Sequence, residues 1–266
     1  MTQSAQHVRL GDLTASAFAA VAKDSPVILL PLGSHEDHGP HQPMGDYLLA
    51  DMIAERIARR AMARGVPTFV TPSLPFGVAD YFGSSAGGLA LSPESFRRVL
   101  QDVLAGLLRH GLRKIIILNA HGGNVPVIHE VTLGVRQSGG PVIPSFYLWK
   151  IARQLMEKRI GVAQGRFGHG AEPLLSLNLA LRTDCVASAE PRVAAQATVL
   201  GLPVSGFGTL DFHGLAVEAP VEFGETGAPA MEAAWQERSA ALGAEVAEAL
   251  VTAGADFVVH FSFIAA

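Results

Sequence analysis

Residues 27–32 read VILLPL, an unbroken apolar run, and they open into the polar loop GSHEDHGPHQPMGD at residues 33–46. A short continuous apolar run is typical of a parallel strand that is covered on both faces. Residues 48–63, LLADMIAERIARRAMA, place apolar side chains at helical spacing opposite a charged face. The segment therefore predicts a buried strand, a polar loop and an amphipathic helix.

The alternation of strands and helices continues along the chain. Ser92 is a favourable N-cap, Pro93 suits the first helical position, and Gly111 ends the helix that they begin. The other expected elements are strands at 68–71, 114–118, 142–148 and 257–263 and helices at 125–137, 172–181 and 231–253. This order predicts an α/β fold with a mainly parallel central sheet flanked by helices, in which ligand sites collect beyond the carboxyl ends of the strands.

The middle of the chain is harder to interpret. Residues 183–223 are left without an assigned element, and Gly and Pro cluster at 201–227, which we interpret as a long functional loop or lid. The sequence contains no internal repeat, heptad pattern or low-complexity linker that would mark a boundary. We therefore predict a single domain over residues 1–266.

Composition narrows the class of protein. The 266 residues are 49% hydrophobic and 17% charged, with a formal net charge of -4 and no run of Lys or Arg, which argues against a nucleic-acid partner. No apolar stretch approaches the roughly 18 to 20 residues that a membrane span needs, and the amino terminus lacks a signal-peptide core. We expect a soluble, cytoplasmic protein. The single cysteine, Cys185, excludes a zinc site built on several thiolates, so a metal must use His and carboxylates.

Residues 33–46 hold the first candidate site. Three His and three carboxylates fall within fourteen residues directly after the buried strand. Glu36 and His38 are two apart in an extended segment, so they could point toward neighbouring ions, and Asp46 is a carboxylate that can bridge two ions. His with carboxylate favours zinc, manganese or iron over calcium. The competing interpretation is a solvated polar loop with one capping Asp.

Two further clusters follow buried elements. Residues 119–124 read NAHGGN, in which His121 can complete a metal shell while Gly122 and Gly123 allow close backbone approach and present amides to an anionic oxygen. Residues 168–172 read GHGAE and place His169 and Glu172 three apart at an expected helix start. Alone, the first of these is as typical of a tight turn as of a site, and the second is weak evidence because a lone His is more often structural than catalytic.

Two other hydrolase motifs have partial matches in the sequence. The string HEDH at 35–38 resembles the zinc protease motif, but its His residues are three apart and Gly39 and Pro40 forbid the helix that the motif needs. Residues 83–87, GSSAG, match the nucleophile elbow of a serine hydrolase with Ser85 as the nucleophile. The elbow requires a strand before the serine and a helix after it, and the sequence around Ser85 suggests neither.

The three clusters, in this order, resemble the creatininase (creatinine amidohydrolase) family over residues 31–181. Members carry a Gly-Ser-x-Glu-x-His-Gly-Pro-His-x-Pro segment ending in Thr-Asp, then Asn-Gly-His-Gly-Gly-Asn, then His-Ala-Gly-Glu-x-Glu-Thr-Ser. The resemblance implies a creatininase-like three-layer sandwich and a homo-oligomer such as a hexamer. It implies metal ligands at Glu36, His38, Asp46, His121 and Glu172.

The resemblance also implies the roles of these residues. Asp46 would bridge two ions, and Glu172, inferred as the remaining ligand, would share the catalytic centre with His169. Three departures stand out: Asp46 comes one residue early, Leu174-Leu175 replaces Glu-Thr, and residues 85–88 replace Phe-Pro-Gly-Thr. Creatinine itself is therefore a poor candidate substrate.

The expected activity is hydrolysis of a C–N bond in a small linear or cyclic amide. Two divalent ions (zinc, manganese or iron) would lower the pKa of a shared water from 15.7 toward about 7, giving a metal-bound hydroxide. His169 would pass a proton to the leaving nitrogen, Gly122 and Gly123 would hold the oxyanion, and Trp149 and Tyr81 would contact the substrate. The leading alternative is a non-catalytic metal or small-ligand binding protein on the same fold.

Overall fold

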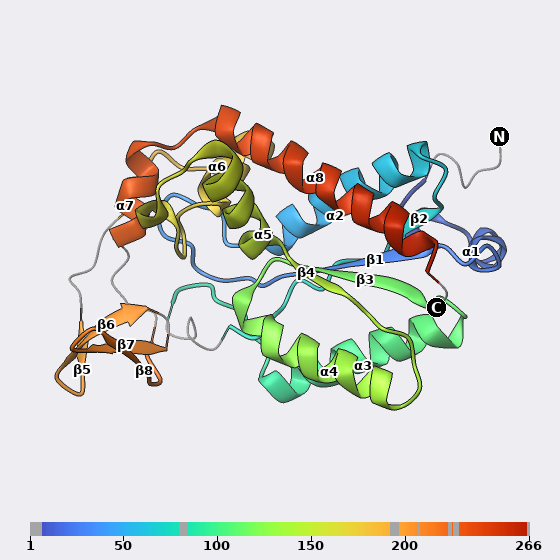
Figure 1. Cartoon of the computed structure of the whole chain (residues 1–266), viewed down its shortest axis with the longest axis horizontal. Helices are drawn as coiled ribbons and strands as arrows, with labels where there is room; N and C mark the ends of the chain where they lie inside the picture. Colours follow the sequence, from blue (N-terminus) through green and yellow to red (C-terminus); the bar gives the residue numbers. More distant parts are fainter. Residues whose placement is uncertain are drawn as a thin grey trace.

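A fully parallel sheet forms the centre of the molecule. The computed structural model describes residues 7–79, 85–191, 197–206, 208–222, 225 and 229–264. Four strands pair in the order β2-β1-β3-β4 (Figure 1). Their bounds are Val27–Leu32 for β1, Thr68–Val70 for β2, Lys114–Asn119 for β3 and Ser145–Tyr147 for β4. Leu32 lies opposite Asn119 in the register, so the carboxyl ends of the two central strands meet at one edge.

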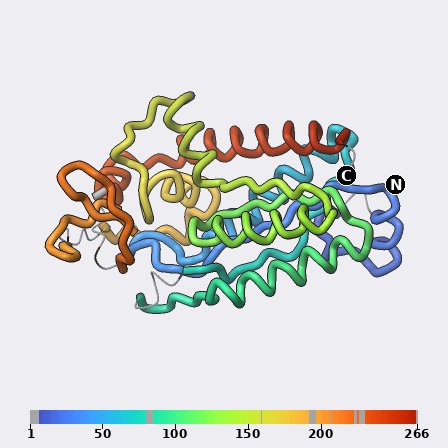
Figure 2. The backbone as a smooth tube through the Cα atoms, turned by 60° about the horizontal axis from the view of Figure 1, so that its bottom comes forward, coloured from blue at the N-terminus to red at the C-terminus, as the bar shows by residue number. Residues whose placement is uncertain are grey.

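Helices cover both faces of this sheet. The bounds of the helices on one face are Tyr47–Ala63 for α2, Leu148–Leu155 for α5, Leu174–Leu181 for α6 and Ala240–Ser262 for α8. Those on the other are Ala15–Ala22 for α1, Pro93–Arg109 for α3 and Val125–Gln137 for α4. Figure 1 shows α8 and α2 on one side of the strands and α3 and α4 on the other, and Figure 2 again separates α8 from α3.

The two faces of β1 explain these layers. All six of its residues are buried, as the apolar run predicted. Val27 and Leu29 belong to the core beneath α2 and α8, while Ile28, Leu30 and Leu32 belong to the core beneath α3 and α4. Successive side chains of a strand point to opposite faces, so one apolar run supplies both cores. The predicted α/β class with a mainly parallel sheet is confirmed.

Local signals set the helix bounds in the first half of the chain. The Ser92 hydroxyl accepts a hydrogen bond from the backbone N–H of Ser95 at 3.2 Å, with Pro93 in the first turn of α3. Gly111 follows the helix with φ of +78°, a conformation that glycine adopts without steric cost. The helix predicted at 125–137 has those bounds in the structure.

The carboxyl-terminal part corrects two predictions. The helix expected at 231–253 is two helices, α7 (Pro229–Gln236) and α8, which is capped by the Ser239 hydroxyl. The strand expected at 257–263 is wrong, because those residues lie in α8 up to Ser262. Val258 is buried in the core, and Phe257 packs edge-on against Phe146 of β4, so helical spacing decides which apolar side chains are covered.

Two other boundaries move. The strand expected at 142–148 is confined to β4, and Leu148 already begins α5. The helix expected at 172–181 begins at Leu174 as α6. The first shift leaves no loop between β4 and α5, and the second lengthens the loop that carries the third polar cluster.

The ambiguous middle of the chain forms a small antiparallel sheet, at the lower left of Figure 1. Its strands are Thr198–Val199 (β5), Leu202–Gly206 (β6), Thr209–Phe212 (β7) and Leu215–Glu218 (β8). Its own core is Val204, Leu210 and Val221. The interpretation of 201–227 as a long loop is thus wrong for residues 202–218. That the whole chain is one domain stays a prediction.

Among the described residues, none of the helices has the length and apolar character required to cross a membrane.

Candidate metal centre

The loop after β1 folds back so that Asp46 returns to the end of the strand. The backbone N–H of Ser34 donates to Oδ1 of Asp46 at 2.6 Å, and the Ser34 hydroxyl lies 3.3 Å from Oδ2. A Cβ on Gly33 would stand 2.3 Å from Asp46 Oδ1, so only glycine fits there. Asp46 is 2% exposed and its side chain makes no capping bond to α2. The loop is therefore neither solvated nor held by a capping Asp.

Asn124 ties together three segments around the site. Its Oδ1 accepts from the backbone N–H of Val78 at 2.9 Å, and its Nδ2 donates to the Gly33 carbonyl and to Asn119 Oδ1, both at 3.1 Å. Asn119 in turn bonds to the backbone of His121. Buried polar groups that are all satisfied in this way rigidify a site. Sequence reasoning gave Asn124 no role, although it closes the NAHGGN motif.

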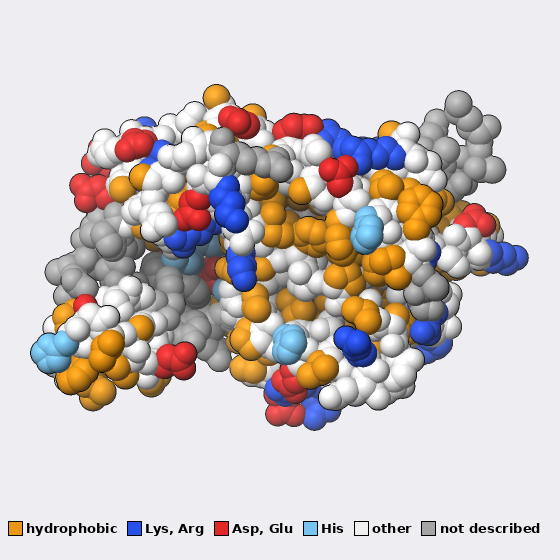
Figure 3. Space-filling model, in the orientation of Figure 1, with side chains coloured by type: hydrophobic (Ala, Val, Ile, Leu, Met, Phe, Trp, Pro, Cys, Tyr) orange, Lys and Arg blue, Asp and Glu red, His pale blue; other side chains and the backbone are white. Residues whose placement is uncertain are grey.

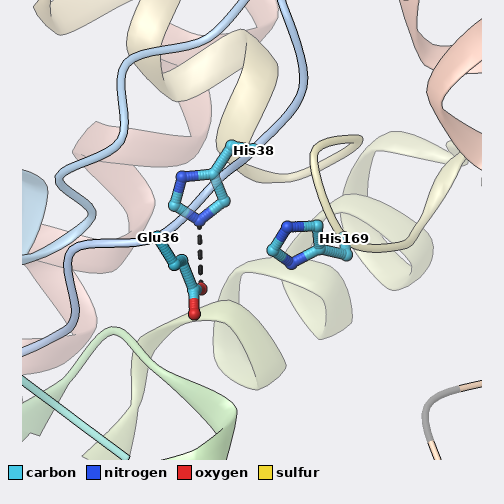
Figure 4. Close-up of side chains that lie close together, drawn as sticks. All are labelled: Glu36, His38 and His169. Carbon is cyan, nitrogen blue, oxygen red and sulfur yellow. Dashed lines mark ion pairs between the residues drawn. The ribbon is translucent and has the colours of Figure 1, made fainter. Parts of the chain in front are cut away.

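Five of the predicted site side chains converge at this edge, and Glu36 is their centre. Oε1 of Glu36 lies 3.0 Å from Nδ1 of His121 and 3.2 Å from Nε2 of His38. Nδ1 of His121 is 3.9 Å from Asp46 Oδ2. The His169 ring stacks on His38 with centroids 4.9 Å apart, and Figure 4 shows both rings beside Glu36.

These side chains form two sets with metal-ligand geometry. Glu36, His38 and His169 make one set, and Glu36, Asp46 and His121 make the other, each with ligand atoms within 4.8 Å of one another. Glu36 is common to both, whereas the resemblance implied that Asp46 is the bridge. The structure thus brings together Glu36 with residues from all three predicted clusters.

Backbone carbonyls orient the two imidazoles that face Glu36. Nε2 of His121 lies 2.7 Å from the Val78 carbonyl oxygen, and Nδ1 of His38 lies 3.2 Å from that of Pro43. A carbonyl oxygen only accepts, so these nitrogens carry protons and the nitrogens that face Glu36 are the metal-binding ones. Oε2 of Glu36 is buried without a hydrogen-bond partner among the described residues. An orphaned carboxylate oxygen beside two oriented imidazoles fits a cation.

The charges of the metal-free centre are tightly linked. Burial works to raise the pKa of Glu36, but hydrogen bonds from His121 and His38 hold that pKa well below its usual range. Burial works to lower the pKa of His121, and Glu36 raises it to about 9. Burial, and then the charge of Glu36, raise the pKa of Asp46 to about 7. Without an ion, protons on the imidazoles balance the carboxylates.

Metal binding should therefore release protons and strengthen with pH. An ion binds the neutral imidazole, so we expect affinity for zinc or manganese to rise from pH 6.5, the ordinary pKa of His, up to about 9, the raised pKa of His121. Calorimetric titration in buffers of different ionisation enthalpy measures both the affinity and the protons released. An affinity that stays flat over this range would contradict the proposed ligands.

Glu172 is placed differently from the other predicted ligands. Its Oε1 accepts from Nη2 of Arg166 at 3.2 Å and from the Ser176 hydroxyl at 2.6 Å, and its Oε2 accepts from the Ser176 backbone N–H. Arg166 also pairs with Glu237 at 2.9 Å. Burial raises the pKa of Glu172 despite these donors. Its carboxylate belongs to neither ligand set, and sequence reasoning missed Arg166, its partner six residues earlier.

The third cluster packs directly on the first. Nε2 of His169 hydrogen bonds to the Asp37 carbonyl at 2.5 Å. Gly170 has φ of +64°, and a Cβ there would meet the His38 carbonyl at 2.5 Å. Burial, followed by the neighbouring His38, lowers the pKa of His169 to about 3. His169 is therefore a neutral imidazole beside the centre.

A cavity of about 790 Å³ opens onto these side chains. It is lined by Glu36, His38, His121 and His169 together with Gly122, Gly123 and Trp149, and also by Tyr147, which was not predicted. Figure 3 shows a hollow in the surface in which His side chains are visible. Tyr81, a predicted substrate contact, lies outside the described residues. Ser85 lies in a turn and is not part of the cavity lining.

Comparisons with known proteins show the family of the chain. A family model described as creatininase, creatinine amidohydrolase, matches residues 11–258. A creatinine amidohydrolase of Pseudomonas putida is 31% identical over 138 residues, covering 49% of this chain and 51% of that protein. A mycofactocin precursor peptide peptidase of Mycobacterium tuberculosis is 27% identical over 136 residues, covering 49% and 54%. The chain thus spans about half the length of the curated relatives it matches.

A solved structure described as creatininase Mn superposes with a TM-score of 0.73 at 24% identity, covering 96% of this chain and 98% of the other. This likeness concerns the fold, and it extends beyond the central sheet to nearly the whole chain.

Proposed function

Because the chain belongs to the creatininase family, we propose that it is a metal-dependent amidohydrolase that cleaves a C–N bond of a small amide. The observation that carries the proposal is that the side chains of Glu36, His38, Asp46 and His121 lie close together in a buried site. Among the described residues, Oε2 of Glu36 has no hydrogen-bond partner. Burying this many ionisable groups is costly unless a cation compensates them. Relatives named for creatinine and for a precursor peptide suggest that the reaction class, and not one substrate, is shared.

We assign two divalent ions, drawn from zinc, manganese or iron, to the two ligand sets. Glu36 serves both sets, with His38 in one and with Asp46 and His121 in the other. His169 belongs to the first set by geometry, but we assign it proton transfer and not coordination. Ions in such a site lower the pKa of water and polarise a carbonyl. Elemental analysis of purified protein should find two ions per chain. A value of one ion per chain would mean that only one of the two ligand sets binds metal.

His169 is assigned the proton transfer to the leaving nitrogen. Its Nε2 hydrogen bonds to the Asp37 carbonyl, so proton transfer is assigned to its other ring nitrogen, Nδ1. The low pKa of His169, caused by burial and by His38, keeps the ring neutral before the reaction. A neutral ring can take up a proton and hand it on within one turnover.

Tyr147 adds a donor that the sequence did not suggest. It ends β4 and lines the cavity, and its hydroxyl would lie 3.1 Å from a Cβ at Gly122. Burial, and then the charges of Asp46 and Glu36, raise the pKa of Tyr147 to about 12, so the hydroxyl stays protonated. Together with the amides at Gly122 and Gly123, it can donate to an oxyanion.

Replacing Tyr147 with Phe tests that role. We expect kcat to fall by roughly a hundredfold to a thousandfold, the usual effect of removing one oxyanion donor, with little change in KM. Metal content serves as the control and should stay at the wild-type level. If kcat is unchanged while metal is retained, the oxyanion is held by other groups.

A screen of formamides, cyclic amides and lactones with added manganese, zinc or iron tests the function itself. Hydrolysis that chelation abolishes and metal restores supports the proposal. Metal uptake without hydrolysis of any compound favours the alternative of a non-catalytic binding protein. Labelling of Ser85 by a fluorophosphonate with activity that survives chelation would point to a serine hydrolase, although α3 begins only at Pro93.

Assembly and location rest on the sequence alone. A homo-oligomer, with a hexamer as one such assembly, and a cytoplasmic location stay predictions. Light scattering of the purified protein measures the first.

A further inference from the structure

One wall of the cavity is built by α5, which begins directly after β4 at the same edge of the sheet as the metal centre. Trp149, Lys150 and Arg153 of this helix all line the cavity. Lys150 and Arg153 are three residues apart and so are neighbours on the helix surface. Figure 3 shows Lys and Arg side chains gathered over α5 beside the hollow.

The two cations differ in their partners. Nε of Arg153 donates to Glu157 at 2.9 Å, and its guanidinium lies 5.0 Å from the centre of the Phe167 ring. Lys150 is exposed, and within the described part of the chain no carboxylate forms an ion pair with it. Lys150 is thus the cation of this wall that a ligand can engage without displacing a protein carboxylate.

Both carboxylates that line the cavity already interact with basic side chains. Glu36 faces His38 and His121 and belongs to both ligand sets. Glu172 accepts from Arg166 and Ser176. A positively charged substrate therefore meets no available counter-charge among the described lining residues, whereas a negatively charged one meets Lys150.

The rest of the lining is largely apolar. Pro126, Val127, Trp149, Phe167 and Leu174 supply it. The volume of about 790 Å³ is within the range of sites that bind drug-sized molecules, so it has room for an apolar body between the metal centre and α5. Apolar walls beside a cation that has no carboxylate partner among the described residues orient a ligand that carries the matching charge.

We propose that the substrate of this centre is an amide with an apolar body and an anionic group, and that Lys150 binds the anion. The inference rests on the proposed function, because it names the substrate class of the same site. Lys150 acts through a charge-assisted hydrogen bond, which is shorter and stronger than a neutral one. Its role is binding and orientation, so it affects KM and kcat/KM for charged amides only.

N-formyl-L-phenylalanine and its neutral carboxamide are the matched probes of turnover. The metal-loaded wild-type protein should show kcat/KM about tenfold higher for the acid, and Lys150→Gln should remove this preference without slowing the neutral amide. Added salt should weaken the preference, because it screens exposed charges. Lys158→Gln is the control, since Lys158 is exposed on the π-helical segment Met156–Ile160 and does not line the cavity.

Binding of phenylacetate and phenylacetamide to the metal-loaded protein gives a readout without turnover. Any direct contact of the carboxylate with metal is the same in both proteins, so the comparison isolates Lys150. We expect Lys150→Gln to weaken phenylacetate about tenfold and to leave phenylacetamide unchanged. Equal phenylacetate affinities in wild type and variant, or no binding of phenylacetate, overturn the inference. If the affinities differ as expected but no amide is hydrolysed, the anion site stands and the proposed function fails.

Discussion

Replacement of Glu36 with Gln is expected to strip the protein of metal and to reduce turnover by about a thousandfold or more, since bound ions supply several kcal/mol of transition-state stabilisation. Glu36 is the one residue common to both ligand sets. Its carboxylate also raises the pKa of His121 above the ordinary value. An amide of the same shape removes the negative charge while preserving the volume, so the loss reports on charge and coordination.

Metal content by elemental analysis and kcat/KM on any substrate found in the amide screen are the two measurements. Glu130→Gln is the matched control, because Glu130 lies on the surface of α4, paired with Arg97 at 2.9 Å. This control should retain both metal and activity. A Glu36→Gln protein that is folded, fully loaded and fully active would remove the basis of the proposed function.

Substitution of Gly123 with Ala should damage the centre without replacing any ligand residue. The added Cβ would stand 2.0 Å from the Val78 carbonyl oxygen and 2.7 Å from Nε2 of His121. Those two atoms form the hydrogen bond that orients the imidazole, so the clash separates them. We expect stability to fall by about 1 to 3 kcal/mol, as for other overpacked sites. A displacement of the order of 1 Å at His121 should lower activity by about a hundredfold.

Urea unfolding, metal affinity and kcat/KM together check this expectation. Gly134→Ala in α4 is the control, because a Cβ at Gly134 meets nothing within 4 Å. Replacing a helical glycine that has open space should leave activity intact and raise stability by up to about 1 kcal/mol. Wild-type metal affinity in Gly123→Ala would show that the Val78 carbonyl does not position His121.

The central half of the fold could be predicted because its signals are local. An apolar run over residues 27–32, an amphipathic stretch after it and the caps of α3 each specify their own element, and the register of β1 with β3 then brings the following loops to one edge. That edge is why Glu36 and His38 could be grouped from the sequence alone with His121, which lies 85 residues after Glu36. Parallel pairing of the two strands is enough to bring them together.

The parts of the fold and site that the sequence did not predict depend on tertiary contacts, which composition does not reveal. Residues 257–263 are rich in aromatic and β-branched side chains, which favour a strand, yet residues up to Ser262 lie in α8, where Phe257 packs against Phe146. Glu172 looked like a ligand because a carboxylate follows His169 in the expected motif. The pairing of Glu172 with Arg166, which also pairs with Glu237, depends on the fold, and a ligand role for Glu172 stays a prediction.

The hydrogen bonds of Asn124 to Gly33, Val78 and Asn119 connect the loops that carry the predicted ligands, and they do not include α5. Loops that carry the ligands are fastened to one another, while the cavity face of α5 takes no part in that fastening. Changes along α5 can therefore retune which molecule is accepted while the reactive centre keeps its shape. The same fold can therefore accept different substrates after substitution of a few side chains in the cavity wall.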